Sequence, residues 1–432
     1  MTPGARASAA IEVLADIEAR KRPASEALKD WGLSHRFAGS GDRAAIGNLV
    51  FDCLRKRASS AFAMGEDTPR ALVLRTLVTS WGKTPEQVAA LADGSRHAPE
   101  PLSEAELEGL AREVPPDAPA PVRGDYPDWL QPLFERAFGA RAGEEGAALA
   151  GRAPVDLRVN MLKATREKVL KALQRFSPMP TLLSPTGVRI LQAPGAGRSP
   201  HVEAEAGHGK GWYEVQDEAS QVAALLTGAK PKAQIIDLCA GAGGKTLALA
   251  ALMQNTGQLY AYDSDRMRLR PIFERLKRAG VRNAQVLQAG DRNALAGLSG
   301  KMDLVLIDAP CTGSGVWRRR PDAKWRLSPQ MLEARIKEQA EVLEQGAPLV
   351  KPGGRLAYIT CSVLPPENCD QVEAFLACHP EFKLIPWRQL WGEALPEMPP
   401  RPSADGSEET LLMTPLSHGT DGFFVAMMER AR

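Results

Sequence analysis

The chain has 432 residues, of which 44% are hydrophobic, so it is long enough to form more than one folded domain. Its 54 lysine and arginine residues nearly balance its 52 aspartate and glutamate residues, and the formal net charge of +2 predicts no overall attraction to nucleic acid or membranes. Charged residues interrupt the N-terminal apolar positions and no apolar run reaches membrane-span length, so we expect a soluble, cytoplasmic protein. The six cysteines form no CxxC pair, which favours reduced thiols and no metal site.

The first part of the chain, residues 1–140, has the pattern of a helical domain. Apolar residues between Ile46 and Leu54 recur at helical spacing, and helix-capping sequences begin at Thr84 and Ser103. A proline-rich stretch, residues 114–121, cannot propagate a helix and predicts a linker. Residues 141–212 are more mixed, with a strand-like run and many glycines, and predict a small intermediate α+β module.

From residue 213 to residue 432, short apolar strands alternate with longer helical stretches, as in parallel βαβ units. The predicted strands are Ile235–Leu238, Leu259–Tyr262, Gln285–Leu287, Leu304–Ile307 and Leu356–Thr360, followed by a hairpin-like pair, Thr410–Met413 and Phe423–Met428. The predicted fold class is α/β: a doubly wound, Rossmann-like sheet preceded by the all-helical domain and the intermediate module. Ligands of such sheets bind at the carboxyl ends of the strands.

A glycine-rich loop follows the first of these strands and comprises Cys239, Ala240, Gly241, Ala242, Gly243, Gly244 and Lys245. Its glycines allow a ligand to approach the backbone, and the next helix directs its positive end there. A phosphate-binding loop of an NTPase is the competing interpretation, but Cys239 occupies the position of its first glycine. Asp263 follows the second strand at a spacing suited to ribose hydroxyls, and Asp291 follows the third, where a carboxylate could accept a hydrogen bond from adenine.

Two cysteines follow the next two strands, in Asp308-Ala309-Pro310-Cys311 and Thr360-Cys361-Ser362. Adjacent strands would place both thiols over the same crevice. Such a pair suits methylation of cytosine at C5, because a thiolate that adds to C6 makes C5 nucleophilic, and the C5 proton must leave afterwards. Asp308 is placed to hydrogen-bond or protonate the edge of the base.

In this order, the motifs resemble those of the RsmB/Nop2/Sun family of RNA (cytosine-C5) methyltransferases, together with residues 320–325 and 421–424. The resemblance implies a class I methyltransferase sheet that binds S-adenosylmethionine through the glycine loop with Asp263, Asp291 and Asp308. It also implies that Cys361 is the nucleophile, that Cys311 assists elimination and that Asp308 contacts the base. The family loop usually has Ala-Pro where this chain has Gly241-Ala242, and losing the proline is expected to loosen the loop without abolishing cofactor binding.

Two polar clusters are candidates for RNA contacts. The first cluster comprises Arg318, Arg319, Arg320, Lys324 and Trp325. It offers cations for phosphates and an aromatic face for base stacking. A solvated basic loop is an equal alternative. The second, which resembles an RNA-facing motif of the family, comprises Arg158, Asn160 and Lys163. The helical domain resembles a NusB-like RNA-binding domain, which favours small-subunit ribosomal RNA as the partner. A transfer-RNA enzyme and a non-catalytic ribosome assembly factor are the alternatives.

Overall fold

The structure, a computed structural model, describes residues 1–197 and 199–432. The chain folds into two compact units. The helical unit comprises Met1–Ala153, Gln192–Ser199 and Trp317–Leu327, and the sheet unit comprises Pro154–Leu191, Pro200–Val316 and Ser328–Arg432. The helical unit therefore continues past residue 140 and includes a segment from the middle of the predicted catalytic domain. Among the described residues, no helix combines the length and apolar character needed to cross a membrane.

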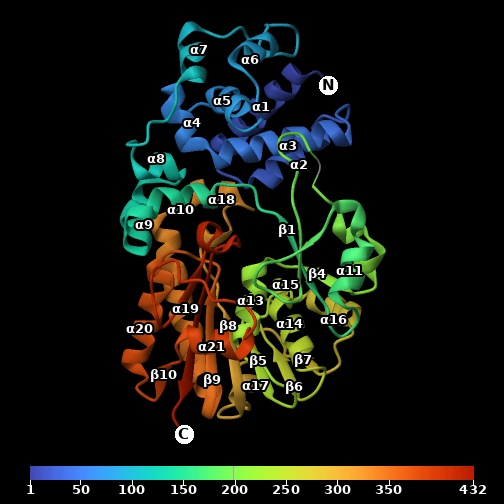
Figure 1. Cartoon of the computed structure of the whole chain (residues 1–432), viewed down its shortest axis with the longest axis vertical. Helices are drawn as coiled ribbons and strands as arrows, with labels where there is room; N and C mark the ends of the chain where they lie inside the picture. The colour runs from blue at the N-terminus through green and yellow to red at the C-terminus, as the bar shows by residue number, and fades with distance from the viewer. Residues whose placement is uncertain (198) are drawn as a thin grey trace. The chain divides into compact units, whose positions relative to one another are not determined.

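The helical unit forms around amphipathic helices that bury one face each, as the apolar spacing predicts (Figure 1). Both predicted capping boxes are confirmed, at Thr84 with Gln87 and at Ser103 with Glu106. The helices are α1 (Pro3–Arg20), α2 (Ala24–Ser34), α3 (Ser40–Arg55), α4 (Arg57–Met64), α5 (Pro69–Thr79), α6 (Pro85–Leu91), α7 (Glu104–Ala111), α8 (Ala120–Gly124), α9 (Gln131–Phe138), α10 (Ala142–Leu149) and α18 (Pro321–Arg326).

The proline-rich stretch between α7 and α8 does not separate two domains. Just beyond it, Asp125 is 1% exposed and accepts hydrogen bonds from the backbone and hydroxyl of Ser59. Tyr126 stacks on Phe134, which in turn stacks on Trp317. The helices on both sides of the prolines therefore belong to one packed unit.

The sheet unit contains a small antiparallel sheet with the strand order β2-β3-β1-β4. Its strands are β1 (Val155–Val159), β2 (Met179–Pro180), β3 (Gly187–Ile190) and β4 (Tyr213–Val215). Helix α11 (Arg166–Ala172) packs on it, and Leu157, Val188 and Tyr213 are buried in the core between them.

The large sheet has eight strands in the order β10-β12-β9-β8-β5-β6-β7, with β11 paired to β12 (Figure 1). The strands are β5 (Gln234–Asp237), β6 (Gln258–Ala261), β7 (Ala284–Val286), β8 (Met302–Asp308), β9 (Val350–Thr360), β10 (Phe382–Leu384), β11 (Leu411–Met413) and β12 (Phe423–Arg430). Strands β5 to β9 are parallel, and β10, β11 and β12 pair antiparallel. All seven predicted strands are confirmed; β10 is additional.

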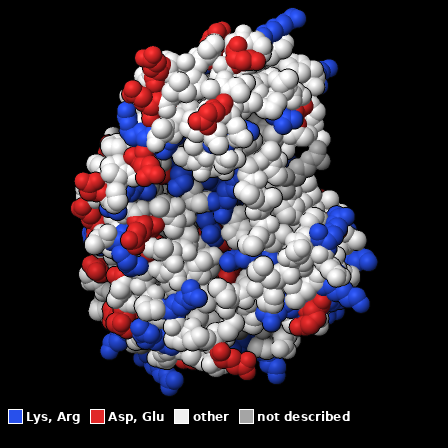
Figure 2. All heavy atoms as spheres, turned by 45° about the horizontal axis from the view of Figure 1, so that its top comes forward, with Lys and Arg blue, Asp and Glu red and all other residues white. Residues whose placement is uncertain are grey.

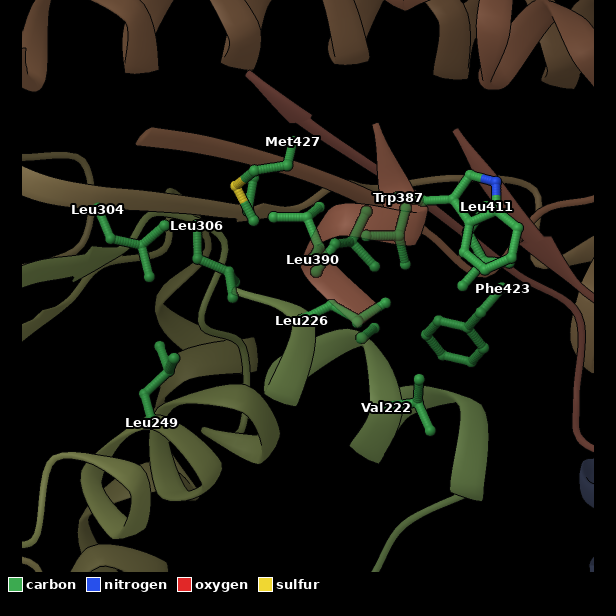
Figure 3. Close-up of a cluster of buried hydrophobic side chains, with 14 of the residues drawn as sticks. Val222, Leu226, Leu249, Leu304, Leu306, Trp387, Leu390, Leu411, Phe423 and Met427 are labelled. Carbon is green, nitrogen blue, oxygen red and sulfur yellow. The ribbon is translucent and has the colours of Figure 1, made fainter. Parts of the chain in front are cut away.

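Helices cover the large sheet and bury its apolar strands. Figure 3 shows Leu304 and Leu306 of β8 and Met427 of β12 facing side chains of α13, α14 and α21. The helices that follow the strands are α13 (Glu218–Leu226), α14 (Gly244–Leu252), α15 (Arg266–Leu269), α16 (Ile272–Ala279), α17 (Arg292–Ala296), α19 (Pro329–Gly346), α20 (Cys369–Cys378) and α21 (Trp387–Ala394). This burial fixes the register of β8 against β5 and β9, and therefore where their carboxyl ends lie.

Candidate functional site

The carboxyl ends of β8 and β9 bring two cysteines together. Asp308 pairs with Ile359 across the two parallel strands, so the loops that follow start at the same level of the sheet. The Sγ atoms of Cys311 and Cys361 lie 3.3 Å apart. The pKa of Cys311 is raised well above its usual range by this hydrogen bond and by burial. Cys311 therefore keeps its proton near neutral pH and can donate its S–H to the Cys361 sulfur.

Asp308 is held by a lysine from the glycine loop. Lys245 Nζ donates to Asp308 Oδ2 at 3.0 Å and to Ser220 Oγ at 2.8 Å. The Lys245 side chain is only 3% exposed, whereas that of Asp308 is 32% exposed, so the carboxylate remains open to a ligand while one oxygen is anchored. Nothing in the sequence marks Ser220, because helix α13 carries no recognisable motif.

The glycine loop wraps against Asp263, which is 2% exposed. Asp263 Oδ2 accepts a hydrogen bond from Gly241 N, and Oδ1 accepts one from Asp265 N, both at 2.9 Å. Gly243 has φ of +86°, and a Cβ there would lie 2.6 Å from the Ile272 side chain, so only glycine fits. A Cβ at Gly241 would lie 3.8 Å from Asp263 Oδ2, so its absence leaves room beside the carboxylate. The loop backbone and the Asp263 carboxylate are therefore the groups at this position that could hold a nucleoside cofactor.

The loop lacks the family's proline, but side chains hold it from outside. Arg275 Nη1 donates to the carbonyl of Ala242 at 2.8 Å, and Arg275 Nη2 donates to Glu214 at 3.0 Å. Glu214 also pairs with Arg278 at 2.6 Å. This anchored arginine restrains the loop where a fixed proline φ would otherwise do so.

Two further residues of the predicted cofactor site are Cys239 and Asp291. Burial raises the pKa of the Cys239 thiol, which leaves it largely unreactive at neutral pH. Asp291 Oδ1 accepts a hydrogen bond from Ala294 N at 3.0 Å and caps α17. Beneath the loop, burial raises the pKa of Asp237 to about 7, and Thr246 donates to its Oδ2 at 2.7 Å.

The first candidate RNA cluster is largely built into the helical unit. Lys324 is 1% exposed and its Nζ donates to the carbonyl of Arg55 at 3.1 Å. Trp325 Nε1 donates to the carbonyl of Leu54 at 2.6 Å, and Arg318 is 6% exposed. Arg319 is half-buried and Arg320 is exposed. The prediction that Lys324 meets phosphate is therefore wrong for this structure, because its ammonium group faces the protein interior.

The second candidate cluster also has internal partners. Arg158 is 5% exposed and donates to Gln216 at 2.6 Å, and burial lowers its pKa to about 10. Asn160 is 3% exposed and donates to the carbonyls of Gly211 and Ala279. Lys163 is exposed, although its Nζ donates to the carbonyl of Arg278 at 2.6 Å. Arg158 and Asn160 therefore brace the fold, and Lys163 alone of the three reaches the surface.

The parallel sheet, the glycine loop at the carboxyl end of β5 and the carboxylates at the ends of β6 and β8 form a doubly wound nucleotide-binding arrangement. Together with the matches that follow, this arrangement is that of a class I methyltransferase. Residues 224–429 match the family described as 16S rRNA methyltransferase RsmB/F, and residues 126–195 match its ferredoxin-like domain. The probable ribosomal RNA small subunit methyltransferase B of Synechocystis is 33% identical over 314 residues, which are 71% of this chain and 67% of that protein. The chain therefore belongs to the RsmB/F family of methyltransferases, whose cofactor is S-adenosylmethionine.

Two solved structures share the fold of this chain. The protein PH0851 is 27% identical, with a TM-score of 0.73 over 100% of this chain and 99% of that one. NSun6 from Pyrococcus horikoshii, solved with SFG, is 22% identical, with a TM-score of 0.62 over 71% of this chain and 98% of that one. The second likeness shows the shared fold alone.

Proposed function

We propose that this protein methylates C5 of a cytosine in RNA through a covalent bond between Cys361 and C6 of the base. The observation that carries the proposal is the 3.3 Å distance between the Cys311 and Cys361 sulfurs beside the anchored carboxylate of Asp308. Methylation at an oxygen or an exocyclic nitrogen requires no thiol, whereas C5 requires a nucleophile at C6 and a later proton loss. Small-subunit ribosomal RNA is the proposed substrate, in line with the description of the family.

The cofactor is proposed to lie on the glycine loop, residues 239–245, with Asp263 accepting hydrogen bonds from its ribose and Asp291 facing its adenine. S-adenosylmethionine supplies an electrophilic methyl group when it is bound. NSun6 from Pyrococcus horikoshii, which shares the fold, was solved with SFG. Lys245, the last residue of this loop, holds Asp308 by a hydrogen bond of 3.0 Å.

Cys361 is proposed as the attacking group. An S–H donor stabilises a neighbouring thiolate, and Cys311 can be that donor because its raised pKa keeps it protonated. The Cys361 thiolate adds to C6, and Asp308 hydrogen-bonds to the edge of the base or passes a proton to it as negative charge moves onto the pyrimidine ring. C5 is then nucleophilic enough to accept a methyl group.

Cys311 is proposed to act in the second half of the reaction. Once Cys361 has bonded to C6, Cys311 lies beside the adduct, because the two sulfurs are 3.3 Å apart. Cys311 releases its proton to solvent and takes the proton from C5. The electrons of the C5–H bond re-form the C5–C6 double bond, and the C6–S bond breaks to release the Cys361 thiolate.

RNA binding is proposed to involve the helical unit together with exposed cations such as Arg320 and Lys163. The face shown in Figure 2 carries both basic and acidic side chains, in keeping with the net charge of +2, so local groups rather than overall charge would select the RNA. A target base in structured RNA would have to leave its stack to reach the cysteines.

The test is methyl transfer from labelled S-adenosylmethionine to purified small-subunit ribosomal RNA and to transfer RNA, followed by digestion to nucleosides. We expect label in 5-methylcytidine from the ribosomal RNA. Label in transfer RNA alone would mean that transfer RNA is the substrate in place of ribosomal RNA. Label in another nucleoside would overturn the C5 assignment. No transfer to either RNA, with cofactor bound, would favour the non-catalytic assembly factor.

A further inference from the structure

Glu367 is a buried carboxylate that contacts both cysteine loops. It is 0% exposed and ends the short helix η7 (Pro365–Glu367), which follows the Cys361 loop. Its Oε1 accepts a hydrogen bond from Thr312 N at 2.7 Å. Its Oε2 accepts hydrogen bonds from the hydroxyls of Thr312 and Ser362. Because Thr312 follows Cys311 and Ser362 follows Cys361, this one carboxylate joins the two loops.

A second buried residue extends this link to the other side of Cys311. Gln339 of α19 is 0% exposed. Its Nε2 donates to the carbonyl of Pro310 at 2.9 Å and to Glu367 Oε1 at 3.0 Å. The residues before and after Cys311 are therefore both tied to Glu367.

We propose that Glu367 is a positioning residue that holds the Cys311 and Cys361 sulfurs at reacting distance. The catalytic part of this role rests on the proposed function, whereas the short distance between the two sulfurs is observed in the structure. Burying a carboxylate is costly unless hydrogen bonds compensate, and here four donors converge on it. Displacing a reacting group by about 1 Å can cost about 100-fold in rate, so a link of this kind matters to catalysis.

The rival explanation is that Glu367 only stabilises the fold. Other hydrogen bonds also connect the two cysteine loops. Gly315 N donates to the carbonyl of Cys361 at 2.9 Å, and the Ser314 and Ser362 hydroxyls lie 2.9 Å apart. If these suffice, removing Glu367 lowers stability without moving the sulfurs. Glu218 provides a matched control, because it is also 0% exposed and accepts hydrogen bonds from two backbone N–H groups, those of Leu183 and Ser184, but it touches neither loop.

The first measurement reports sulfur geometry without RNA. Full-length protein is equilibrated with oxidised and reduced glutathione, and the Cys311–Cys361 disulfide is quantified by peptide mass spectrometry. One thiolate displaces glutathione to form a mixed disulfide, and the second thiol displaces the other glutathione, so the two cysteines are oxidised while one oxidised glutathione becomes two reduced molecules. We expect Glu367→Ala to lower the effective concentration of the pair about tenfold or more, Glu367→Gln to have an intermediate effect, and Glu218→Ala to match the wild type.

The second measurement is methyl transfer by the same proteins. We expect Glu367→Ala to lower kcat about 100-fold while KM for cofactor and RNA changes little. If Glu367→Ala does not fold, Glu367→Gln, which is nearly the same size, decides the question. Wild-type disulfide formation in both Glu367 variants, or an equal loss in Glu218→Ala, would overturn the proposal, as would weakened disulfide formation with full methylation. If Glu367 variants lose the disulfide while the wild type makes no 5-methylcytidine, the proposed function fails and the positioning role stands.

Discussion

Replacing Asp263 with asparagine should weaken cofactor binding with little effect on the rest of the site. Asp263 is 2% exposed and accepts hydrogen bonds from Gly241 N and Asp265 N. Asparagine retains one oxygen but turns an NH2 group toward one of these donors and loses the charge that would bind ribose hydroxyls. A hydrogen bond to a charged group contributes about 1.5–3 kcal/mol, so we expect the Kd for S-adenosylmethionine to rise roughly 10- to 150-fold.

Calorimetric titration with S-adenosylmethionine measures this effect. Asp265→Asn is the matched control, since Asp265 is exposed and caps α15 through Met267 N at 2.7 Å. We expect the control to bind the cofactor like the wild type. Equal affinity in Asp263→Asn and the wild type would show that Asp263 does not contact the cofactor.

Three other predictions follow from buried groups and packing. Burial lowers the pKa of Lys324 from 10.5 to about 7, so the unfolded chain binds this proton more readily than the folded chain, and the free energy of unfolding should rise between pH 7 and pH 10. Urea unfolding of Lys324→Met should show a smaller rise than the wild type over this range. Parallel curves for the two proteins would refute this prediction. Lys245→Met should lower kcat about 100-fold because Asp308 loses its anchor, and a change below threefold in steady-state assays would contradict that role. A chain that starts at Tyr126 should bind a hydrophobic dye and aggregate, because the cut divides the helical unit; a soluble protein with one sharp melting transition would argue otherwise.

Much of the fold could be predicted because its signals are local. The strands β5 to β9 are apolar runs separated by helical stretches, and that alternation predicts a parallel sheet. Consecutive strand ends also predicted that Cys311 and Cys361 would meet, and the structure brings their sulfurs together. Their chemical roles stay predictions.

Other features depend on contacts between distant residues. The stretch around Lys324 has the composition of an RNA-binding loop, but it packs into the helical unit, where Asp322 accepts a hydrogen bond from Ala24 N at 3.3 Å. Likewise, nothing near Glu367 in the sequence marks it as a partner of Thr312, because the two residues meet only through the packing of β8 and β9. The sequence indicates which contacts a side chain could make, whereas tertiary packing determines which contacts it does make.

The most direct test of the central claim is to trap the covalent intermediate. Cys311→Ala, Cys361→Ala and the double variant are incubated with substrate RNA and labelled S-adenosylmethionine and then separated by denaturing electrophoresis. We predict that Cys311→Ala stalls before elimination and carries label in a protein–RNA band, whereas Cys361→Ala and the double variant form no such band. A labelled adduct in Cys361→Ala would contradict the account, because the nucleophile would then be a different residue.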